Sequence, residues 1–193
     1  LHFNNMKTIV AVIVALTYTF ATVAAETCQN ELQKQNLDTQ RFFKGDWYVT
    51  YIKDGTKDAA CRQYKTKIEG SLVKLTADGD YIFDGQKKRY TTTCSTTTGT
   101  SLNPRGPFVL KCRHIYDKDN SNIFFDLKMS VVETDYDNYA LVYRCTTYDQ
   151  PLNLNYGNYV LLMRNKNADV SKVTASLKNP NWSLNRFTKT TGC

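Results

Sequence analysis

The hexapeptide GDWYVT at residues 45–50 is the stretch that decides the fold. It places Trp47, one of only two tryptophans in the chain, at the start of the first convincing strand pattern, Trp47 to Lys53. Phe42 and Phe43 stand just upstream. A large aromatic residue that opens an alternating apolar and polar segment indicates a side chain buried at the point where a sheet begins.

Short strand patterns dominate the chain after Trp47. In the clearest of them, Ile123 to Val131, every second residue is apolar, which is typical of a strand with one buried and one largely solvated face. Eight or nine such segments, separated by turn signals, predict an all-β barrel or sandwich. The expected strands are Trp47 to Lys53, Arg62 to Glu69, Leu72 to Thr76, Tyr81 to Asp84, Lys88 to Cys94, Phe108 to Tyr116, Ile123 to Val131, Tyr139 to Thr147 and Tyr156 to Arg164.

Two segments have helical patterns, and a third segment has the composition of a turn. Glu31 to Gln35 is a short helix candidate before the first strand. Ala168 to Lys178 carries four apolar residues roughly on one helical face, with Asn167 or Asp169 as a possible cap. Ala77 to Asp80 is interpreted as a turn. An antiparallel sheet that closes on itself removes its edges, and the C-terminal helix is then expected to pack on the outer wall.

Residues 1–25 are expected to precede the folded domain. Met6 and Lys7, an apolar core from Ile9 to Leu16 and small residues ending at Ala25 are typical of a secretory signal peptide. The five residues before Met6 are interpreted as upstream sequence. The apolar core is shorter than the ~20 residues that span a bilayer, so a membrane anchor is the less favoured interpretation. Residues 26–193 are expected to form one secreted, extracellular domain.

The chain is basic, and its formal net charge of +7 becomes +6 without residues 1–25, which contain one lysine and no acidic residue. The run Lys87-Lys88-Arg89, with Lys111 and Arg113, raises the alternative of nucleic-acid binding. These residues lie on strand patterns with alternating outward positions, so a solvated face is favoured and no nucleic-acid partner is expected. A basic rim would also steer an anionic ligand toward the barrel.

All six cysteines follow residue 25, and an even number in a secreted chain implies disulfides. Six cysteines allow 15 connectivities, but one pair can be argued from position. Cys94 and Cys112 are equidistant from residue 103, within the turn signal Asn103-Pro104-Arg105-Gly106. A hairpin about that turn would place the two cysteines opposite each other. No C-x-x-C spacing is present, so bound metal is the less favoured use of these thiols.

Three motifs in sequence order resemble those of lipocalins. Gly45-Asp46-Trp47 matches the G-x-W that begins the first strand, Thr134-Asp135-Tyr136 matches the second motif, and Arg164 matches the arginine that ends the last strand. The resemblance implies an eight-stranded antiparallel lipocalin barrel with a C-terminal helix packed outside. It also implies that Trp47 plugs the closed end and that Arg164 packs across it.

The cysteine pattern and the segment DNYALVYRC, residues 137–145, resemble the triabin and pallidipin group of triatomine salivary lipocalins, with the nitrophorins as more distant relatives. The resemblance covers essentially all of the chain after residue 25. It implies the pairs Cys28–Cys145 and Cys61–Cys193, and it agrees with the hairpin argument for Cys94–Cys112.

No catalytic constellation is visible after residue 25, and an enzyme is not expected. His114 is the single histidine there, and no G-x-S-x-G, P-loop or H-E-x-x-H motif is present. Asp117 begins a calcium-like loop, but Asn122 and Lys128 replace the required Gly and Glu, so no metal is expected. Nitrophorins bind haem through a histidine in the region corresponding to residues 72–90, where this chain has none. His114 is therefore interpreted as a surface or packing residue and no cofactor is expected, although a distinct site at His114 stays open.

The first functional hypothesis is a scavenger of small mediators. The resemblance implies that the barrel sequesters a host mediator such as ADP, an eicosanoid or a biogenic amine, and thereby inhibits platelet aggregation. The basic charge favours an anionic mediator, whereas Asp54 and Asp58 after the first strand are the residues that would favour an amine instead. Parity along the strands nominates as ligand-binding residues Tyr51, Phe125, Leu127, Met129 and Leu162.

The second hypothesis is a protein-binding inhibitor. In the triabin group some members block a host coagulation or platelet-activation factor through their surface, so a host haemostatic protein is the alternative partner. A monomer without a membrane partner is expected in either case. Asn181-Trp182-Ser183 is a glycosylation sequon, and Trp182 is interpreted as a lid over the outer wall.

Overall fold

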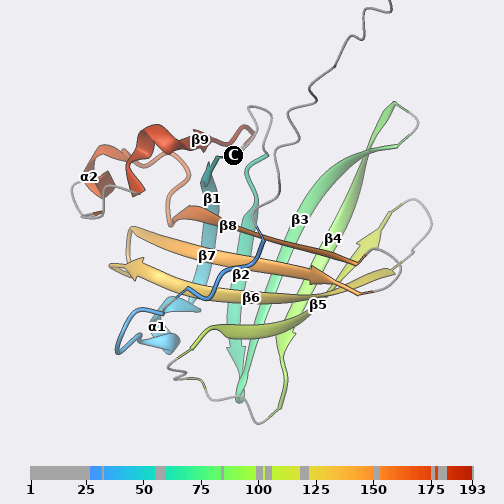
Figure 1. The fold of residues 1–193 in the computed structure, drawn as a ribbon, viewed down its shortest axis with the longest axis horizontal. Helices are drawn as coiled ribbons and strands as arrows, with labels where there is room; N and C mark the ends of the chain where they lie inside the picture. Colours follow the sequence, from blue (N-terminus) through green and yellow to red (C-terminus); the bar gives the residue numbers. More distant parts are fainter. Residues whose placement is uncertain are drawn as a thin grey trace, which may run out of the picture.

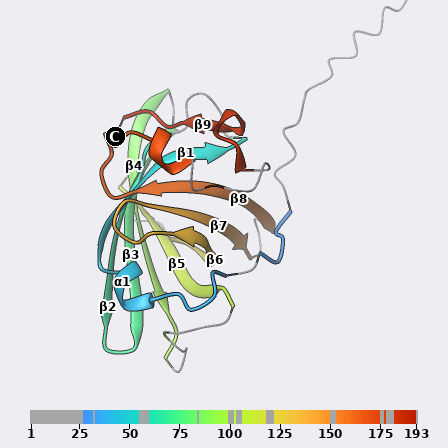
Figure 2. The same ribbon diagram turned by 90° about the vertical axis from the view of Figure 1, so that its left-hand side faces the viewer.

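The protein is an antiparallel β-barrel of eight strands with a short ninth strand outside (Figures 1 and 2). The computed structural model describes residues 27–31, 33–54, 60–83, 85–98, 102, 106–117, 122–149, 153–174, 177 and 182–192. Its elements are α1 (Thr39–Phe42), β1 (Gly45–Lys53), β2 (Gln63–Glu69), β3 (Leu72–Phe83), β4 (Gln86–Thr96), β5 (Phe108–Tyr116), β6 (Asn122–Thr134), β7 (Tyr139–Tyr148), β8 (Leu154–Met163), α2 (Ser171–Thr174), the 3-10 turn η2 (Leu184–Arg186) and β9 (Phe187–Lys189).

Strand β1 closes the barrel because it has neighbours on both sides. Each strand from β2 to β8 pairs with the next, and β1 pairs with both β8 and β2. The pairing with β2 covers Gly45 to Tyr48, and β9 takes over this edge from Tyr51 to Lys53. The expected eight-stranded antiparallel barrel is confirmed, and β9 is an addition that the sequence patterns did not indicate.

A β-bulge in β1 changes which side chains face the interior. Val49 pairs with Leu162, but Tyr51 pairs with Leu161, so one extra residue is inserted between them. A one-residue insertion reverses the alternation of the side chains that follow it. Trp47 and Val49 therefore point into the barrel, whereas Tyr51 packs against the outer wall. The prediction that Tyr51 lies beside Trp47 inside the barrel is therefore wrong.

The outer faces of β7 and β8 form a second apolar core. All residues from Tyr139 to Tyr143 and from Tyr159 to Met163 are buried, so both faces of these strand segments are covered. The C-terminal segment covers the outer face with α2 and β9 (Figure 1), and Trp182 packs there as expected. The expected helix outside the barrel is present, but α2 is limited to four residues within the described chain; residues 175, 176 and 178 lie outside the described ranges.

Two further local expectations are wrong. Residues 31–35 form no described helix, because the backbone there bonds to β6: Lys34 N donates to Val131 O at 2.7 Å and Ser130 Oγ donates to Glu31 O at 3.1 Å. Residues 77–80 form no turn, because β3 continues through them and pairs with β4. Gly79 serves close packing instead of a turn, since a β-carbon there would overlap the ring of Tyr90.

The closed end of the barrel is built around Trp47. Its side chain is fully buried, and its indole Nε1 donates to Phe42 O at 2.9 Å. The guanidinium of Arg164 lies over the indole, 3.6 Å from the ring centroid. Phe43 packs edge-on against Phe108 beneath this contact, with ring centroids 4.9 Å apart. These residues make the plug that the lipocalin resemblance implies.

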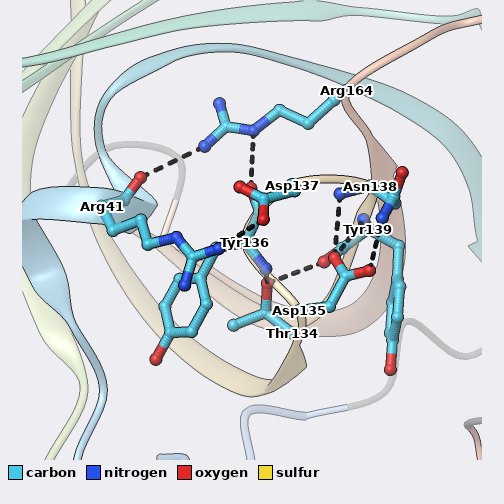
Figure 3. Close-up of polar contacts among 8 residues, drawn as sticks. All are labelled: Arg41, Thr134, Asp135, Tyr136, Asp137, Asn138, Tyr139 and Arg164. Carbon is cyan, nitrogen blue, oxygen red and sulfur yellow. Dashed lines mark hydrogen bonds and ion pairs between the residues drawn. The ribbon is translucent and has the colours of Figure 1, made fainter.

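Arg164 also joins the end of α1 and the start of β1 to the β6–β7 loop by hydrogen bonds. Figure 3 shows its bonds to the carbonyls of Arg41 and Tyr136. Its guanidinium donates to the carbonyls of Phe42 and Asp46 on one side and to the carbonyl of Tyr136 on the other. Tyr136 has a positive φ of 71°, and its amide is held by the Thr134 hydroxyl at 2.9 Å. The carboxylate of Asp135 accepts from the amides of residues 138 and 139, which completes the loop. The second lipocalin motif thus fixes the conformation of the loop whose Tyr136 carbonyl accepts a hydrogen bond from Arg164.

The described residues contain the disulfides Cys28–Cys145 and Cys94–Cys112. Cys94 and Cys112 are direct partners in the β4–β5 register, as the hairpin argument requires. Cys61 is disulfide-bonded, and its amide donates to Thr191 O at 2.7 Å, close to the end of the chain. Several named residues lie outside the described ranges, so their assignments stay predictions: the segment 1–25, Asp58, Asn181 and Cys193. Within the described residues, no helix is both long enough and apolar enough to cross a membrane.

We expect Trp47→Ala to lower the free energy of unfolding by ~3–5 kcal/mol, because it leaves a large cavity beneath Arg164. Urea denaturation followed by far-UV circular dichroism measures this change. Trp182→Ala is the control, since Trp182 is only half-buried on the outer wall and should cost less. An unchanged midpoint for Trp47→Ala would show that this residue does not close the barrel.

We expect peptide mapping of the non-reduced protein to recover three linked pairs, with Cys61 joined to Cys193. The hydrogen bond between Cys61 and Thr191 motivates this pairing, because it brings residue 61 close to the chain end. Recovery of Cys61 linked to any other cysteine would contradict the prediction.

Candidate functional site

A cavity of ≈ 230 Å³ lies inside the barrel, between the Trp47 plug and the opposite end. One part of its wall is apolar, with Val49, Ile52, Leu75, Ala77, Phe125 and Leu127. The remaining wall is rich in polar and aromatic groups, with Arg62, Tyr64, Tyr90, Thr92, His114, Arg144, Thr146, Tyr148 and Tyr156. The cavity therefore offers both an apolar surface and hydrogen-bonding groups to a small ligand.

The ligand-binding residues predicted from alternation along the strands lie in three different places. Phe125 and Leu127 line the cavity. Met129 and Leu162 also face the interior, but they lie in the packed core and are not part of the cavity wall. Met129 pairs with Phe108 near the plug, which explains its depth. Tyr51 faces outward after the bulge. Parity identifies a face of a strand, but it does not locate the level at which a barrel is hollow.

The alternation of side chains along β5 and β7 also places polar residues on the inward face. On β5 the buried positions alternate from Phe108 to His114, so His114 shares the inward face. On β7 the inward positions Val142 and Thr146 flank Arg144. A charged residue at an inward position of a barrel strand is unusual enough to mark a ligand site. Of the two alternatives for His114, a surface or a packing residue, the surface alternative is wrong, because the side chain is buried in the cavity wall and packs on Phe125.

Arg144 spans the interior of the barrel. Its Nε donates to Asn158 Oδ1 at 2.8 Å on the neighbouring β8, and its Nη1 donates to the hydroxyl of Tyr64 at 2.6 Å. Tyr64 lies on β2, which does not pair with β7, so this bond crosses the hollow. Both partners are neutral, and the positive charge of Arg144 is not matched by a carboxylate among the described residues that line the cavity.

Arg62 adds a second cation to the same cavity. Its guanidinium carbon lies 5.3 Å from the ring centroid of Tyr90. Two permanent cations therefore face the hollow, while the described lining residues include no Asp or Glu. Asp54, a carboxylate that would favour an amine, lies outside with Lys53 and Arg186 at 2.9 and 3.3 Å. The hydrogen bond from Lys53 lowers the pKa of Asp54, so it stays ionised there.

His114 is held between two hydroxyl groups. Its Nδ1 lies 2.8 Å from Thr92 Oγ1, and its Nε2 lies 3.0 Å from the hydroxyl of Tyr148. The ring stacks at an angle on Phe125, with centroids 4.4 Å apart. Burial lowers the pKa of His114 to about 4, and the nearby charge of Arg62 acts in the same direction. The imidazole is therefore neutral at physiological pH, where it can donate one hydrogen bond and accept another.

Within the described ranges, no group of three or more His, Cys, Asp or Glu side chains is placed to hold a metal ion.

The profile of the family described as Triabin matches residues 20–176 of the sequence. The chain belongs to the triabin family.

Proteins of triatomine bugs are similar to this triabin-family chain over most of its length. Triafestin-2 of Triatoma infestans is 34% identical over 165 residues, which cover 83% of this chain and 79% of that protein. Pallidipin of Meccus pallidipennis is 30% identical over 164 residues, which cover 83% of each chain.

Two solved structures share the barrel. LTBP1 in complex with leukotriene C4 is 26% identical, with a TM-score of 0.56 over 83% of this chain and 90% of that one. The amine-binding protein of Rhodnius prolixus, in its tryptamine complex, has a TM-score of 0.64 over 85% of this chain and 86% of that one, at 21% identity. At 21% identity, the second similarity shows only that this chain shares the lipocalin-like fold.

We expect the stability of the protein to fall as pH drops from about 6.5 to about 4, because the unfolded chain then protonates His114 and the folded chain does not. The loss attributable to His114 should reach about 3 kcal/mol once the pH is below both values. Urea denaturation of the wild type and of His114→Gln, each at about pH 7.5 and about pH 4.5, isolates this contribution. An equal loss in both proteins would show that His114 titrates normally.

Proposed function

We propose that the protein is a secreted salivary lipocalin that sequesters a small anionic lipid mediator, of the eicosanoid class, in its barrel. The observation that carries this proposal is the pairing of Arg62 and Arg144 with an apolar wall, in a cavity whose described lining has no carboxylate. A carboxylate head group would neutralise the cations by charge-assisted hydrogen bonds. A hydrocarbon tail would cover Phe125 and Leu127.

The family relations support this class of ligand. LTBP1, which is 26% identical, is bound to leukotriene C4 in its structure. Removal of an eicosanoid signal would inhibit platelet aggregation without catalytic turnover, so the protein would act by binding and not as an enzyme. The described disulfides require an oxidising compartment, which supports secretion.

The same geometry disfavours the other mediators. A cationic amine would meet two arginines and no carboxylate in the described wall of the cavity. ADP could place its diphosphate against the same arginines, but it has no hydrocarbon chain to cover Phe125 and Leu127. The ≈ 230 Å³ of space is also below the ~300–1,000 Å³ of typical ligand pockets, so a small ligand, or the head and first part of a longer one, fits best. A surface inhibitor of a coagulation or platelet-activation factor remains the alternative prediction.

Isothermal titration calorimetry of the dialysed protein tests the ligand class. We expect leukotriene C4 or arachidonic acid to bind more tightly than ADP or serotonin. Arg62→Gln and Arg144→Lys should each weaken binding of the anion by roughly 10- to 100-fold, the range for loss of a hydrogen bond to a charged group. Arg186→Gln is the control, because Arg186 is exposed on the outer wall.

The melting temperature of each variant confirms that the barrel is intact before the titration. Tight serotonin binding without measurable binding of either anionic lipid would overturn the proposal. Equal losses in all three variants would also overturn it, because they would reflect overall charge and not the cavity.

A further inference from the structure

The outer wall of the barrel over β2, β3 and β5 carries a concentrated set of cations. We define the basic track as Lys65, Lys67, Lys74, Lys111 and Arg113. Four of these residues line a surface hollow of ≈ 470 Å³, and Lys65 lines an adjoining hollow of ≈ 340 Å³. Both hollows include Thr76, the residue that pairs with Lys65, so they form one continuous surface.

The strand register arranges the basic track in two rows. Lys67 pairs with Lys74, Lys74 with Ser95, and Ser95 with Lys111, so one row of three cations crosses from β2 to β5. At a strand spacing of about 4.8 Å this row is about 14 Å long. Lys65 and Arg113 end a parallel row, two residues further along β2 and β5 and thus about 7 Å away.

The charge of the basic track is only partly balanced. Lys67 and Lys74 face each other directly, an arrangement that repels, and they share the carboxylate of Glu69. Lys111 pairs with Asp126 at 2.7 Å. Lys65 and Arg113 form no ion pair with any carboxylate of the described residues, and Arg113 donates only to the hydroxyl of Thr93, at 3.3 Å. The five cations of the track are therefore paired with two carboxylates. The adjoining hollow beside Lys65 also holds Asp78 and Asp80, which are outnumbered there by Arg62, Arg89 and Lys166.

An exposed aromatic ring lies at the end of the track. Phe124 pairs with Arg113, lines the larger hollow and is 68% exposed. Burying an exposed ring of this size against a partner lowers the free energy, because its apolar surface leaves water. The cations beside it favour a partner that is anionic and also presents an apolar face.

We propose that the basic track binds a sulfated polysaccharide chain. Sulfate groups along the polymer would accept hydrogen bonds from the lysines and from the fork of Arg113. The carbon face of a sugar ring would pack on Phe124 by dispersion. A hollow about three strand spacings long suits a linear chain. Single-stranded nucleic acid is usually held by several stacking aromatic side chains, but Phe124 is the only aromatic residue in the described lining of the larger hollow.

The basic track is independent of the ligand cavity. Its side chains point outward from β2, β3 and β5, while Tyr64, Val73 and His114 of the same strands point inward. Binding of a polysaccharide would hold the protein at a cell surface without blocking the barrel. The proposal therefore stands or fails separately from the proposed small ligand.

Heparin affinity tests the proposal. We expect the protein to be retained on immobilised heparin at about 0.15 M NaCl. The double variant Lys65→Gln/Arg113→Gln should elute at lower salt, and the slope of log Kd against log[NaCl] should fall by about two, one for each lost sulfate contact. Lys44→Gln/Lys189→Gln is the matched control, because it removes the same charge from exposed residues outside the track and should elute close to the wild type.

Phe124→Ser should weaken heparin binding and leave the salt slope unchanged, because it removes an apolar contact. Double-stranded DNA, and phosphatidylcholine vesicles with about 30% phosphatidylserine, are the competing partners. Lack of retention, equal losses in both double variants, or tighter binding to DNA or vesicles than to heparin would each overturn the proposal.

Discussion

The contact between Arg164 and Trp47 is the interaction on which the barrel depends. A guanidinium 3.6 Å from the indole centroid adds ~0.5–2 kcal/mol to the burial of the ring. The same guanidinium donates to carbonyls before and within β1 and to the loop after β6. One side chain therefore joins the first strand, the last barrel strand and the β6–β7 loop at the closed end. Without it, these carbonyls would lose a buried donor and the plug would lose its cover.

The closed end sets the shape of the rest of the molecule through β1. This strand starts at the plug, pairs with β2 and β8, and then leaves β2 for β9 after its bulge. The bulge turns Tyr51 toward the outer wall and places Ile52 at the cavity. The barrel wall separates two apolar cores: one inside the barrel, and one between the β7–β8 face and the C-terminal segment. The Cys28–Cys145 disulfide ties the N-terminal segment to the same outer face.

The cavity above the plug is chemically one-sided. Two arginines and a neutral histidine line it with several tyrosines, and its described wall contains no carboxylate. Tyr64 and Asn158 orient Arg144 without neutralising it. Keeping this cation inside a barrel costs desolvation energy that a bound anion would offset. An uncompensated interior charge of this kind is better explained by ligand binding than by stability, which an apolar residue would serve equally well.

The sequence by itself determined the barrel, its plug and the cysteine partners Cys94 and Cys112. Alternation along the strands predicted a barrel or sandwich, and symmetry about a turn predicted the cysteine pair. The closed barrel and its plug were what the resemblance of three motifs to those of lipocalins implied. Only the tertiary structure decided the helix boundaries, the β9 strand and the cavity. Residues 31–35 are extended because β6 supplies their hydrogen bonds, and Gly79 is a packing residue because Tyr90 crosses it. Tyr51 faces outward because one inserted residue reversed the alternation of side chains along β1. Met129 lies too deep to line the cavity because the plug fills the barrel at its level. Alternation along β5 and β7 places His114 and Arg144 on inward faces, but only the meeting of these strands across the hollow shows that both residues line one cavity.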